Sequence, residues 1–523
     1  MNRADVTRTV TIFFFLATSA LTALAERINH EGRILGDMQL VTTPLLFNTA
    51  AADAIVAAMQ VMPVDSAWNE DISARPLLAN SAEMISRIKA DLSSTRQTLR
   101  PFYEMNYVIV PPDYPRRAIN FFNYADESDL EGGTGTTGLY PIAPNTPVET
   151  WPRNTEGLTL EQWQRDIYDE GGDRHSIIVD PAAGFIWETW LTRLVGNNWE
   201  ASNGAKFGLN SNALRPAGWT SADAAGLPMF PAVVRYDECE RGMVEHALRL
   251  IVAKTRRQYI YPATHYASSI PATSAQYPAM GQRLRLKSAF VIPANWTKQE
   301  KAVLLAFKKY GGVVADNGGF FSISVCPDDR FPSGAFDHLS TIDVNNFEVI
   351  ETTSATGGPR SPGAPSVDVG ADQTTQFPGG AVILEAQVND PGGTAVVQWK
   401  KYSGPGTVTF QNSSQPQTSA TFSAPGLYTL MVSGANGIHP IAYDAVVVQS
   451  LPRVAIDPSG NDIVLTFATS AGQRYRCEQR SDLTAGEWLP LADNIYGTGS
   501  NVAVTDFGAT PDGQTFYRLV VLP

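Results

Sequence analysis

A segment at residues 353–366, TSATGGPRSPGAPS, rules out a single continuous core for this chain. Its glycines, prolines and small polar residues supply almost no apolar surface, so we expect a linker rather than a folded element. Most of the tryptophans and histidines precede it, whereas short alternating strands with Gly, Pro and Asn turns follow it. A chain of 523 residues divided in this way predicts one large domain at 27–352 and smaller β-modules after the linker.

The part that follows the linker has the pattern of a small β-sandwich, with short apolar strands at regular spacing. Its characteristic strand and turn residues are Asp390-Pro-Gly-Gly393, Trp399-Lys400, Gly404-Pro-Gly406 and Ala424-Pro-Gly-x-Tyr428. In these residues, positions 367–450 resemble a PKD or immunoglobulin-like domain, and the resemblance implies a fold but no ligand. Residues 451–523 resemble the small C-terminal β-sandwich of many exported bacterial proteins, a module that spaces or anchors.

The domain at 27–352 is expected to be mainly β, sandwich-like or jelly-roll-like, with a few helices. Residues 283–291 alternate strictly between apolar and basic, as a strand with two different faces does. Residues 81–92 have helical spacing, and Thr297-Lys-Gln-Glu300 is a capping box that opens another helix. Asp316-Asn-Gly-Gly319 then predicts a hairpin turn.

Residues 1–25 are typical of a cleavable export signal. An apolar run after two arginines ends at Ala23-Leu-Ala25, a small-residue cleavage site. We therefore expect a secreted protein whose mature chain has no membrane span. The formal net charge of −13 disfavours nucleic acid as a partner, because nucleic-acid binding requires a basic face.

We expect neither a metal nor a cofactor. The six histidines and three cysteines have no spacing typical of a metal site, and the chain has no phosphate-binding motif. In an exported protein, Cys239 and Cys326 are expected to form either a disulfide or a pair of buried unpaired thiols.

The densest group of aromatic and ionisable residues lies at 218–246, between glycines and prolines. Cleavage of a glycosidic bond requires two carboxyl groups across that bond, one of them kept protonated by its surroundings. Asp237 and Glu238 follow Arg235, which would keep one carboxylate ionised while the other donates a proton. The alternative interpretation is a structural ion pair.

Asp173 and His175 are further catalytic candidates, because residues two apart at the start of a strand point to the same face. They predict a histidine base oriented by an aspartate, or else a buried polar pair. We expect the segment 218–246 to fold back so that Asp237 or Glu238 approaches them, because these charges neutralise one another in one cleft.

Candidates for substrate binding lie near aromatic residues or turns. They are Trp219, Asp223, Arg235, His265, Tyr266, Arg283, Asp65, Trp68 and Asp316. Asp223 equally fits a helix cap, and Asp316 equally fits a turn. The basic face that contains Arg283 predicts either a solvated surface or a cationic stripe that binds an acidic sugar.

The large domain also contains a set of distinctive blocks. They are Gly218-Trp-Thr-Ser-Ala-Asp-Ala-Ala-Gly-Leu-Pro228, Arg235-Tyr-Asp-Glu238, His246-Ala-Leu-Arg249, His265-Tyr-Ala-Ser268, Met280-Gly-x-Arg-Leu-Arg-Leu-Lys287 and Ala315-Asp-Asn-Gly318. In these blocks, most of 60–350 resembles a family of exported bacterial proteins without an assigned activity, often fused to sugar-binding or Ig-like modules. The resemblance implies work on polysaccharides by association and assigns no catalytic residues.

Together these features favour a secreted glycoside hydrolase that cleaves an extracellular polysaccharide by carboxylate acid/base catalysis. The alternative of another class is a noncatalytic glycan-binding or cell-surface adhesion protein, which large β-rich domains with aromatic loops also form. A polysaccharide lyase that acts on uronates is the alternative among enzymes.

Overall fold

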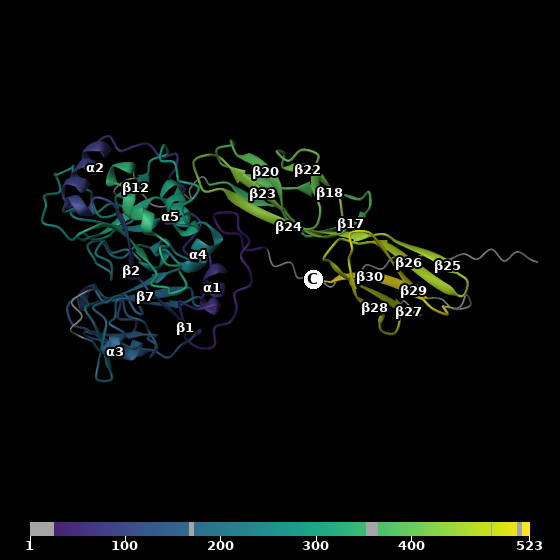
Figure 1. Ribbon diagram of the computed structural model, residues 1–523, viewed down its shortest axis with the longest axis horizontal. Coiled ribbons are helices and arrows are strands. Elements are labelled where there is room, and N and C mark those ends of the chain that lie inside the picture. The colour runs from purple at the N-terminus through teal and green to yellow at the C-terminus, as the bar shows by residue number, and fades with distance from the viewer. Residues whose placement is uncertain (1–25, 167–171, 352–363, 483, 510–514, 523) are drawn as a thin grey trace, which may run out of the picture. The chain divides into compact units, whose positions relative to one another are not determined.

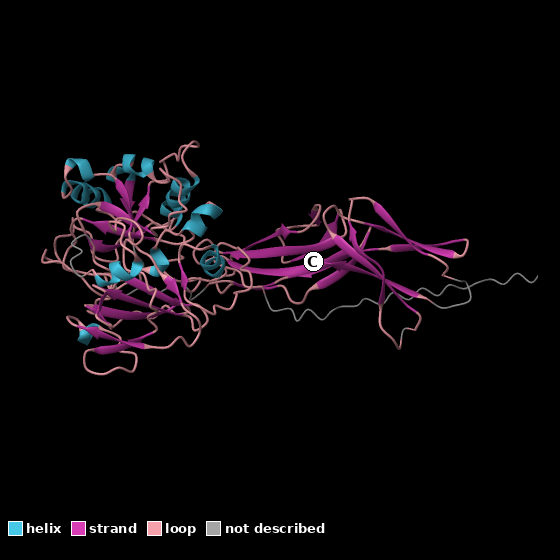
Figure 2. Ribbon diagram, turned by 60° about the horizontal axis from the view of Figure 1, so that its bottom comes forward, coloured by secondary structure: helices cyan, strands magenta, loops and turns pink. Residues whose placement is uncertain are grey.

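The computed structural model describes residues 26–166, 172–351, 364–482, 484–509 and 515–522. The expected export signal at 1–25 and nearly all of the expected linker at 353–366 lie outside the described residues. The chain divides into two compact units, an N-terminal unit within Asn29–Pro362 and a C-terminal unit within Gly363–Pro523. The predicted mainly β fold is confirmed, and all helices of the described chain precede residue 352 (Figure 2).

The helices of the N-terminal unit are short. The α-helices are α1 (Ala50–Ala57), α2 (Ser81–Ala90), α3 (Leu160–Arg165), α4 (Tyr236–Arg241) and α5 (Lys298–Lys309). The 3-10 helices are η1 (Ser94–Arg96), η2 (Ala125–Glu127), η3 (Phe230–Ala232), η4 (Asp337–Thr341) and η5 (Val344–Asn346). At the start of α5, the side chains of Thr297 and Glu300 each accept from the other's backbone N–H, which confirms the predicted capping box.

The largest sheet of this unit has six strands and mixed directions. Its order is β15 (Phe347–Val349), β12 (Arg283–Leu286), β13 (Gly312–Asn317), β11 (Leu248–Val252), β14 (Phe321–Val325) and β2 (Leu99–Tyr103). β11 runs parallel to β13 and antiparallel to β14, and β14 runs parallel to β2. Helices α5 and α2 pack against β12 and β15 (Figure 1). The strands of a jelly roll are antiparallel. The parallel pairs β11–β13 and β14–β2 therefore distinguish this sheet from a jelly roll.

Two further sheets complete the N-terminal unit. One has the order β1 (Leu45–Leu46), β3 (Val108–Ile109), β6 (Ser176–Asp180), β7 (Phe185–Trp190) and β10 (Asn203–Gly208). The other has the order β5 (Thr137–Tyr140), β4 (Arg117–Phe121), β9 (Asn198–Ala201) and β8 (Arg193–Val195). All five residues of β6 are buried, so this strand lies in the interior of the unit.

Alternation on the central strands gives the six-stranded sheet an apolar and a polar face. Leu250 on β11 and Ile323 on β14 enter the core that also contains residues of α2 and α5. Their neighbours Arg249 and Ser324 point to the opposite face, because successive side chains of a strand alternate. The polar face therefore collects hydrophilic side chains in the interior of the unit.

A β-bulge brings Asp316 to this polar face. Leu250 pairs with Val314, but the next residue of β11 pairs with Asp316, so β13 has one extra residue at this point. One inserted residue reverses the side on which all later side chains lie. Asp316 consequently shares the face of Arg249 instead of entering the apolar core.

The predicted hairpin at Asp316-Asn-Gly-Gly319 is wrong. β11 lies between β13 and β14, so this segment connects two strands that are not neighbours. The chain does reverse its direction here, as the turn residues indicate. However, β11, which comes from another part of the chain, lies between β13 and β14.

Both interpretations of the basic face at residues 283–291, a solvated surface and a cationic stripe, are wrong for Arg283 and Arg285. β12 covers only the first part of the segment and lies between two other strands. Arg283 is 6% exposed, with its guanidinium 3.5 Å from the Glu70 carboxylate, and Arg285 pairs with Glu348 at 2.7 Å. The alternation separates leucines from arginines as predicted, but carboxylates distant in the sequence neutralise the basic face.

The described secondary structure of the C-terminal unit consists of β-strands. Residues 366–452 form β16 (Ser366–Asp368), β17 (Gln373–Phe377), β18 (Ala381–Glu385), β19 (Gln387–Asn389), β20 (Val396–Ser403), β21 (Val408–Phe410), β22 (Gln417–Phe422), β23 (Gly426–Ala435) and β24 (Ala442–Pro452). Their main sheets, β17-β24-β23-β20 and β18-β22-β21, enclose a core that contains Trp399 and Tyr428. This arrangement is an Ig-like β-sandwich.

The last part of the chain forms two three-stranded sheets. They contain β25 (Val454–Ser459), β26 (Asp462–Ala468), β27 (Arg474–Arg480), β28 (Leu489–Tyr496), β29 (Asn501–Asp506) and β30 (Phe516–Leu522), in the orders β25-β26-β29 and β28-β27-β30. Phe467 and Tyr475 lie in their common core. Among the described residues of the whole chain, no helix has the length and apolar character to cross a membrane.

Candidate active site

Arg249 on β11 organises a group of ionisable side chains on the polar face of the six-stranded sheet. Its Nε donates to Asp223 Oδ2 at 2.5 Å, and its Nη2 donates to Asp316 Oδ2 at 3.0 Å. Its Nη1 lies 3.7 Å from Glu104 Oε1, which also accepts from the Ser324 hydroxyl at 2.6 Å. Three carboxylates thus share one guanidinium, and we call Arg249, Asp223, Asp316 and Glu104 the Arg249 cluster.

The members of the Arg249 cluster differ in their access to solvent. The side chains of Arg249 and Asp223 are only 3% and 1% exposed, so Asp223 cannot reach a substrate. Those of Glu104 and Asp316 are 18% and 22% exposed. Because both contact one planar guanidinium, these two carboxyl groups lie within roughly 10 Å of each other, the range found for catalytic carboxyl pairs.

Both accessible carboxyl groups hold protons more tightly than usual. Burial raises the pKa of Glu104 to about 7, with a further contribution from the Glu149 carboxylate and opposition from Arg249. Burial also raises the pKa of Asp316 to about 6, against the attraction of Arg249. Both shifts have the same direction, so each of these carboxyl groups can hold a proton closer to neutral pH than an exposed carboxyl group does.

The structure separates the predicted Asp173–His175 pair. Asp173 is exposed, whereas His175 is buried and is oriented by Glu149, whose Oε2 lies 2.9 Å from His175 Nδ1. His175 Nε2 lies 3.0 Å from the Ala222 carbonyl oxygen. Since both partners only accept, both ring nitrogens donate, and this arrangement requires the imidazolium form. His175 is therefore a buried cation that anchors the segment around Ala222, and the predicted role as a base is wrong.

The charge of His175 predicts a stability that depends on pH. Although burial opposes the charged form, Glu149 raises the pKa of His175 to about 9, above the ordinary value near 6.5. The stabilisation is complete below the unfolded-state pKa and is lost as the pH rises through 9, by on the order of 3 kcal/mol. We expect urea unfolding to show this loss between about pH 6.5 and 9, and to show a much smaller loss for His175→Gln. Equal pH dependence of both proteins would contradict the assignment.

Glu188 on β7 holds the loop that follows Asp223. Its carboxylate is fully buried and accepts from the backbone N–H groups of Met229 and Phe230, at 2.9 to 3.0 Å. Burial raises the pKa of Glu188 to about 7, against these hydrogen bonds. This contact, which the sequence did not indicate, fixes the Pro-rich part of the segment 218–246 to the second sheet.

Two of the predicted binding residues lie in a ladder of aromatic rings next to the Arg249 cluster. The rings of His265 and Tyr266 are nearly parallel with centroids 5.8 Å apart, and those of Tyr266 and Tyr259 are 6.3 Å apart. His265 Nδ1 donates to the carbonyl of Ala224, the residue after Asp223, at 2.7 Å. The half-buried rings therefore offer apolar faces close to the cluster, as a sugar-binding surface requires.

Asp237 and Glu238 do not approach His175. They lie in the first turn of α4, where Glu238 contacts Arg235 at 2.6 Å and His246 at 3.1 Å, and Asp237 contacts Arg241 at 2.6 Å.

Although burial opposes ionisation, Arg235 and His246 lower the pKa of Glu238 to about 2. A carboxylate held ionised in this way cannot donate a proton near neutral pH, and Asp237, whose side chain is 5% exposed, is itself paired with Arg241. Neither carboxyl group is therefore available as the predicted proton donor. The structural ion pair is the interpretation that the contacts favour.

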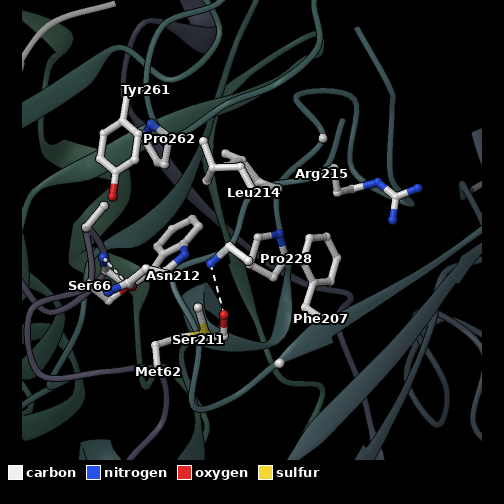
Figure 3. A pocket seen from close by; sticks show the side chains of 16 residues that line it. Met62, Ser66, Phe207, Ser211, Asn212, Leu214, Arg215, Pro228, Tyr261 and Pro262 are labelled. Atoms are coloured by element: carbon white, nitrogen blue, oxygen red, sulfur yellow. Dashed lines mark hydrogen bonds between the residues drawn. The ribbon is translucent and has the colours of Figure 1, made fainter. Parts of the chain in front are cut away.

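Asp65, Trp68 and Trp219 lie apart from the carboxyl pair. Trp68 is 3% exposed and lines a separate pocket with about 420 Å³ of empty space (Figure 3). Asp65 Oδ1 accepts from Asn212, another lining residue, at 2.7 Å. Trp219 is half-buried, with the Arg215 guanidinium 5.6 Å from its ring centroid. This pocket brings together Leu214, Phe207, Asn212 and Tyr261, but no carboxyl group lines it (Figure 3).

Cys239 and Cys326 are free thiols that are buried in two different cores, so the predicted alternative of a disulfide is wrong. Within the described ranges, no three His, Cys, Asp or Glu side chains are arranged to hold a metal ion.

Comparison with known proteins identifies one part of the chain. A family model that describes a PKD domain matches residues 369–449. No curated protein matches the chain.

Similar solved structures include the PKD domain from the KIAA 1837 protein, at 20% identity over 19% of this chain and 98% of that chain, with a TM-score of 0.17. The PKD domain from human KIAA0319 is similar at 19% identity over 20% and 99% of the two chains, also with a TM-score of 0.17. Residues 369–449 form a PKD domain.

Proposed function

We propose that the N-terminal unit is a glycoside hydrolase that cleaves an extracellular polysaccharide, with Glu104 and Asp316 as the catalytic carboxyl pair. The observation that carries this proposal is the pair itself. Two partly exposed carboxyl groups share the buried Arg249, and burial raises the pKa of one to about 7 and of the other to about 6.

The two carboxyl groups have different roles in this proposal. Protonated Glu104 donates its proton to the glycosidic oxygen as the bond to the leaving sugar breaks. Ionised Asp316, which has the shorter contact with Arg249, either removes a proton from the attacking water or attacks the sugar itself. Arg249 positions both groups. The buried Asp223 fixes the guanidinium by accepting a hydrogen bond from its Nε.

The surroundings of the pair support a sugar as the substrate. The ladder of His265, Tyr266 and Tyr259 provides stacked rings beside the cluster, and pyranose rings bind to such apolar faces. An exported protein is the expected context, since residues 1–25 have the pattern of a signal and the chain carries a PKD domain, a kind of module that occurs in extracellular proteins.

The direct test is incubation of the full mature chain with a panel of plant, algal and bacterial polysaccharides. We expect new reducing ends from at least one polymer, without a rise in ultraviolet absorbance. A rise in absorbance from unsaturated uronates would favour a lyase instead. Binding to a polymer without any new chain ends would refute the hydrolase and favour the noncatalytic glycan-binding or adhesion protein.

A further inference from the structure

Two exposed arginines stack on aromatic rings, one in the segment 317–320 that directly follows Asp316 and the other in the aromatic ladder. Arg96 donates to the carbonyl of Gly319 at 3.3 Å. The guanidinium of Arg96 also lies 4.1 Å from the centroid of the Phe320 ring, a stacked arrangement typical of a cation over an aromatic face.

Asn317 donates to the carbonyl of Ala267 at 2.7 Å, which connects this segment to the aromatic ladder. Arg257 lies over the ring of Tyr266, 5.7 Å from its centroid, and its Nε is 3.3 Å from the tyrosine hydroxyl oxygen. Each arginine thus combines an aromatic ring with a guanidinium at the edge of the proposed site.

Neither Arg96 nor Arg257 forms an ion pair with a carboxylate in the described part of the chain, and both are exposed. Arg249, Arg283 and Arg285, by contrast, are all paired with carboxylates. Two stacked but uncompensated guanidinium groups are well suited to bind anions, because the planar fork matches carboxylate and sulfate oxygens.

We propose that the polysaccharide is anionic and that Arg96 and Arg257 bind its carboxylate or sulfate groups. This inference rests on the proposed function, since it names the class of substrate for the same site. The charged substituents would contact the two guanidinium groups, which the rings of Phe320 and Tyr266 hold in position.

The test measures binding rather than cleavage, with Glu104→Gln in every protein so that no polymer is degraded. Polygalacturonate is compared with its fully methyl-esterified form, and dextran sulfate with neutral dextran, so that each anionic polymer has an uncharged counterpart. We expect at least tenfold tighter binding of an anionic polymer than of its counterpart. We expect Arg96→Gln together with Arg257→Gln to remove that preference and to reduce its salt dependence.

The matched control is Arg165→Gln together with Lys298→Gln, which removes the same charge from two exposed positions on α3 and α5. It should leave binding within about twofold, since exposed charges far from the ligand are screened. The inference would be overturned if polygalacturonate bound no better than its methyl ester and dextran sulfate no better than dextran. An equal loss of binding in the control variant would also overturn it. In the panel with the wild-type chain, cleavage of a neutral polysaccharide alone would refute the anionic substrate and keep the hydrolase. Arginine-dependent binding without any cleavage by the wild-type chain would do the reverse.

Discussion

Replacement of Glu104 by glutamine is expected to reduce kcat by a factor of roughly 10²–10⁴ on the substrate that the panel identifies. The amide keeps the size of the side chain and can still contact Ser324 and Arg249, but it has no proton to donate to the leaving oxygen. Binding should change little, because a proton donor acts mainly in the transition state. Initial rates and KM for the purified variant measure both effects.

The control for this variant is Glu161→Gln, the same change at a side chain that is 73% exposed on α3. It should retain full activity. Full activity of Glu104→Gln and of Asp316→Asn on a confirmed substrate would assign the chemistry to other residues.

The pH profile provides an independent check of the two roles. Activity should rise as the pH passes the pKa of Asp316, about 6, and fall as it passes the pKa of Glu104, about 7. In Glu104→Gln the residual activity should lose the alkaline limb and keep the acidic one. A residual alkaline limb of unchanged position would show that another group is the acid.

Replacement of Arg249 by methionine is expected to destabilise the N-terminal unit by about 3–5 kcal/mol. Asp223 would remain 1% exposed without its cation, and a buried unpaired charge is among the most destabilising defects in a protein. Urea unfolding followed by tryptophan fluorescence measures the loss, because most of the tryptophans precede residue 352.

The double variant Arg249→Met with Asp223→Asn isolates the cause. Removal of both charges leaves no unpaired charge between these two residues. The loss in the free energy of unfolding should therefore be smaller for the double variant than the sum of the losses for the two single variants. Strictly additive losses would mean that the two residues stabilise the unit independently of their ion pair.

The sequence predicted the local elements where neighbouring residues alone determine them. The capping box at Thr297 and Glu300 forms as expected, and the helical spacing at 81–92 corresponds to α2. The strand and turn residues of 369–449 likewise predicted the sandwich that the PKD family match supports. These are short-range signals, and no distant contact overrides them here.

The candidate site was only partly accessible to such reasoning. Asp316, His265 and Tyr266 were among the predicted binding residues, whereas Glu104, Glu149 and Glu188 were missed. Glu104 directly follows a strand and has no distinctive neighbours, and Glu188 lies inside a strand of buried residues. A signal was present in Arg249, a basic residue within an otherwise apolar strand, since a buried arginine requires carboxylate partners.

The sequence by itself determined the mainly β character, because periodicity and turn residues act over a few neighbours. The tertiary structure alone decided which carboxylates share Arg249 and that His175 is a cation. A one-residue bulge in β13 places Asp316 on the face of Arg249. No local pattern encodes these pairings, because each joins segments that are far apart in the chain and depends on the register in which they pack.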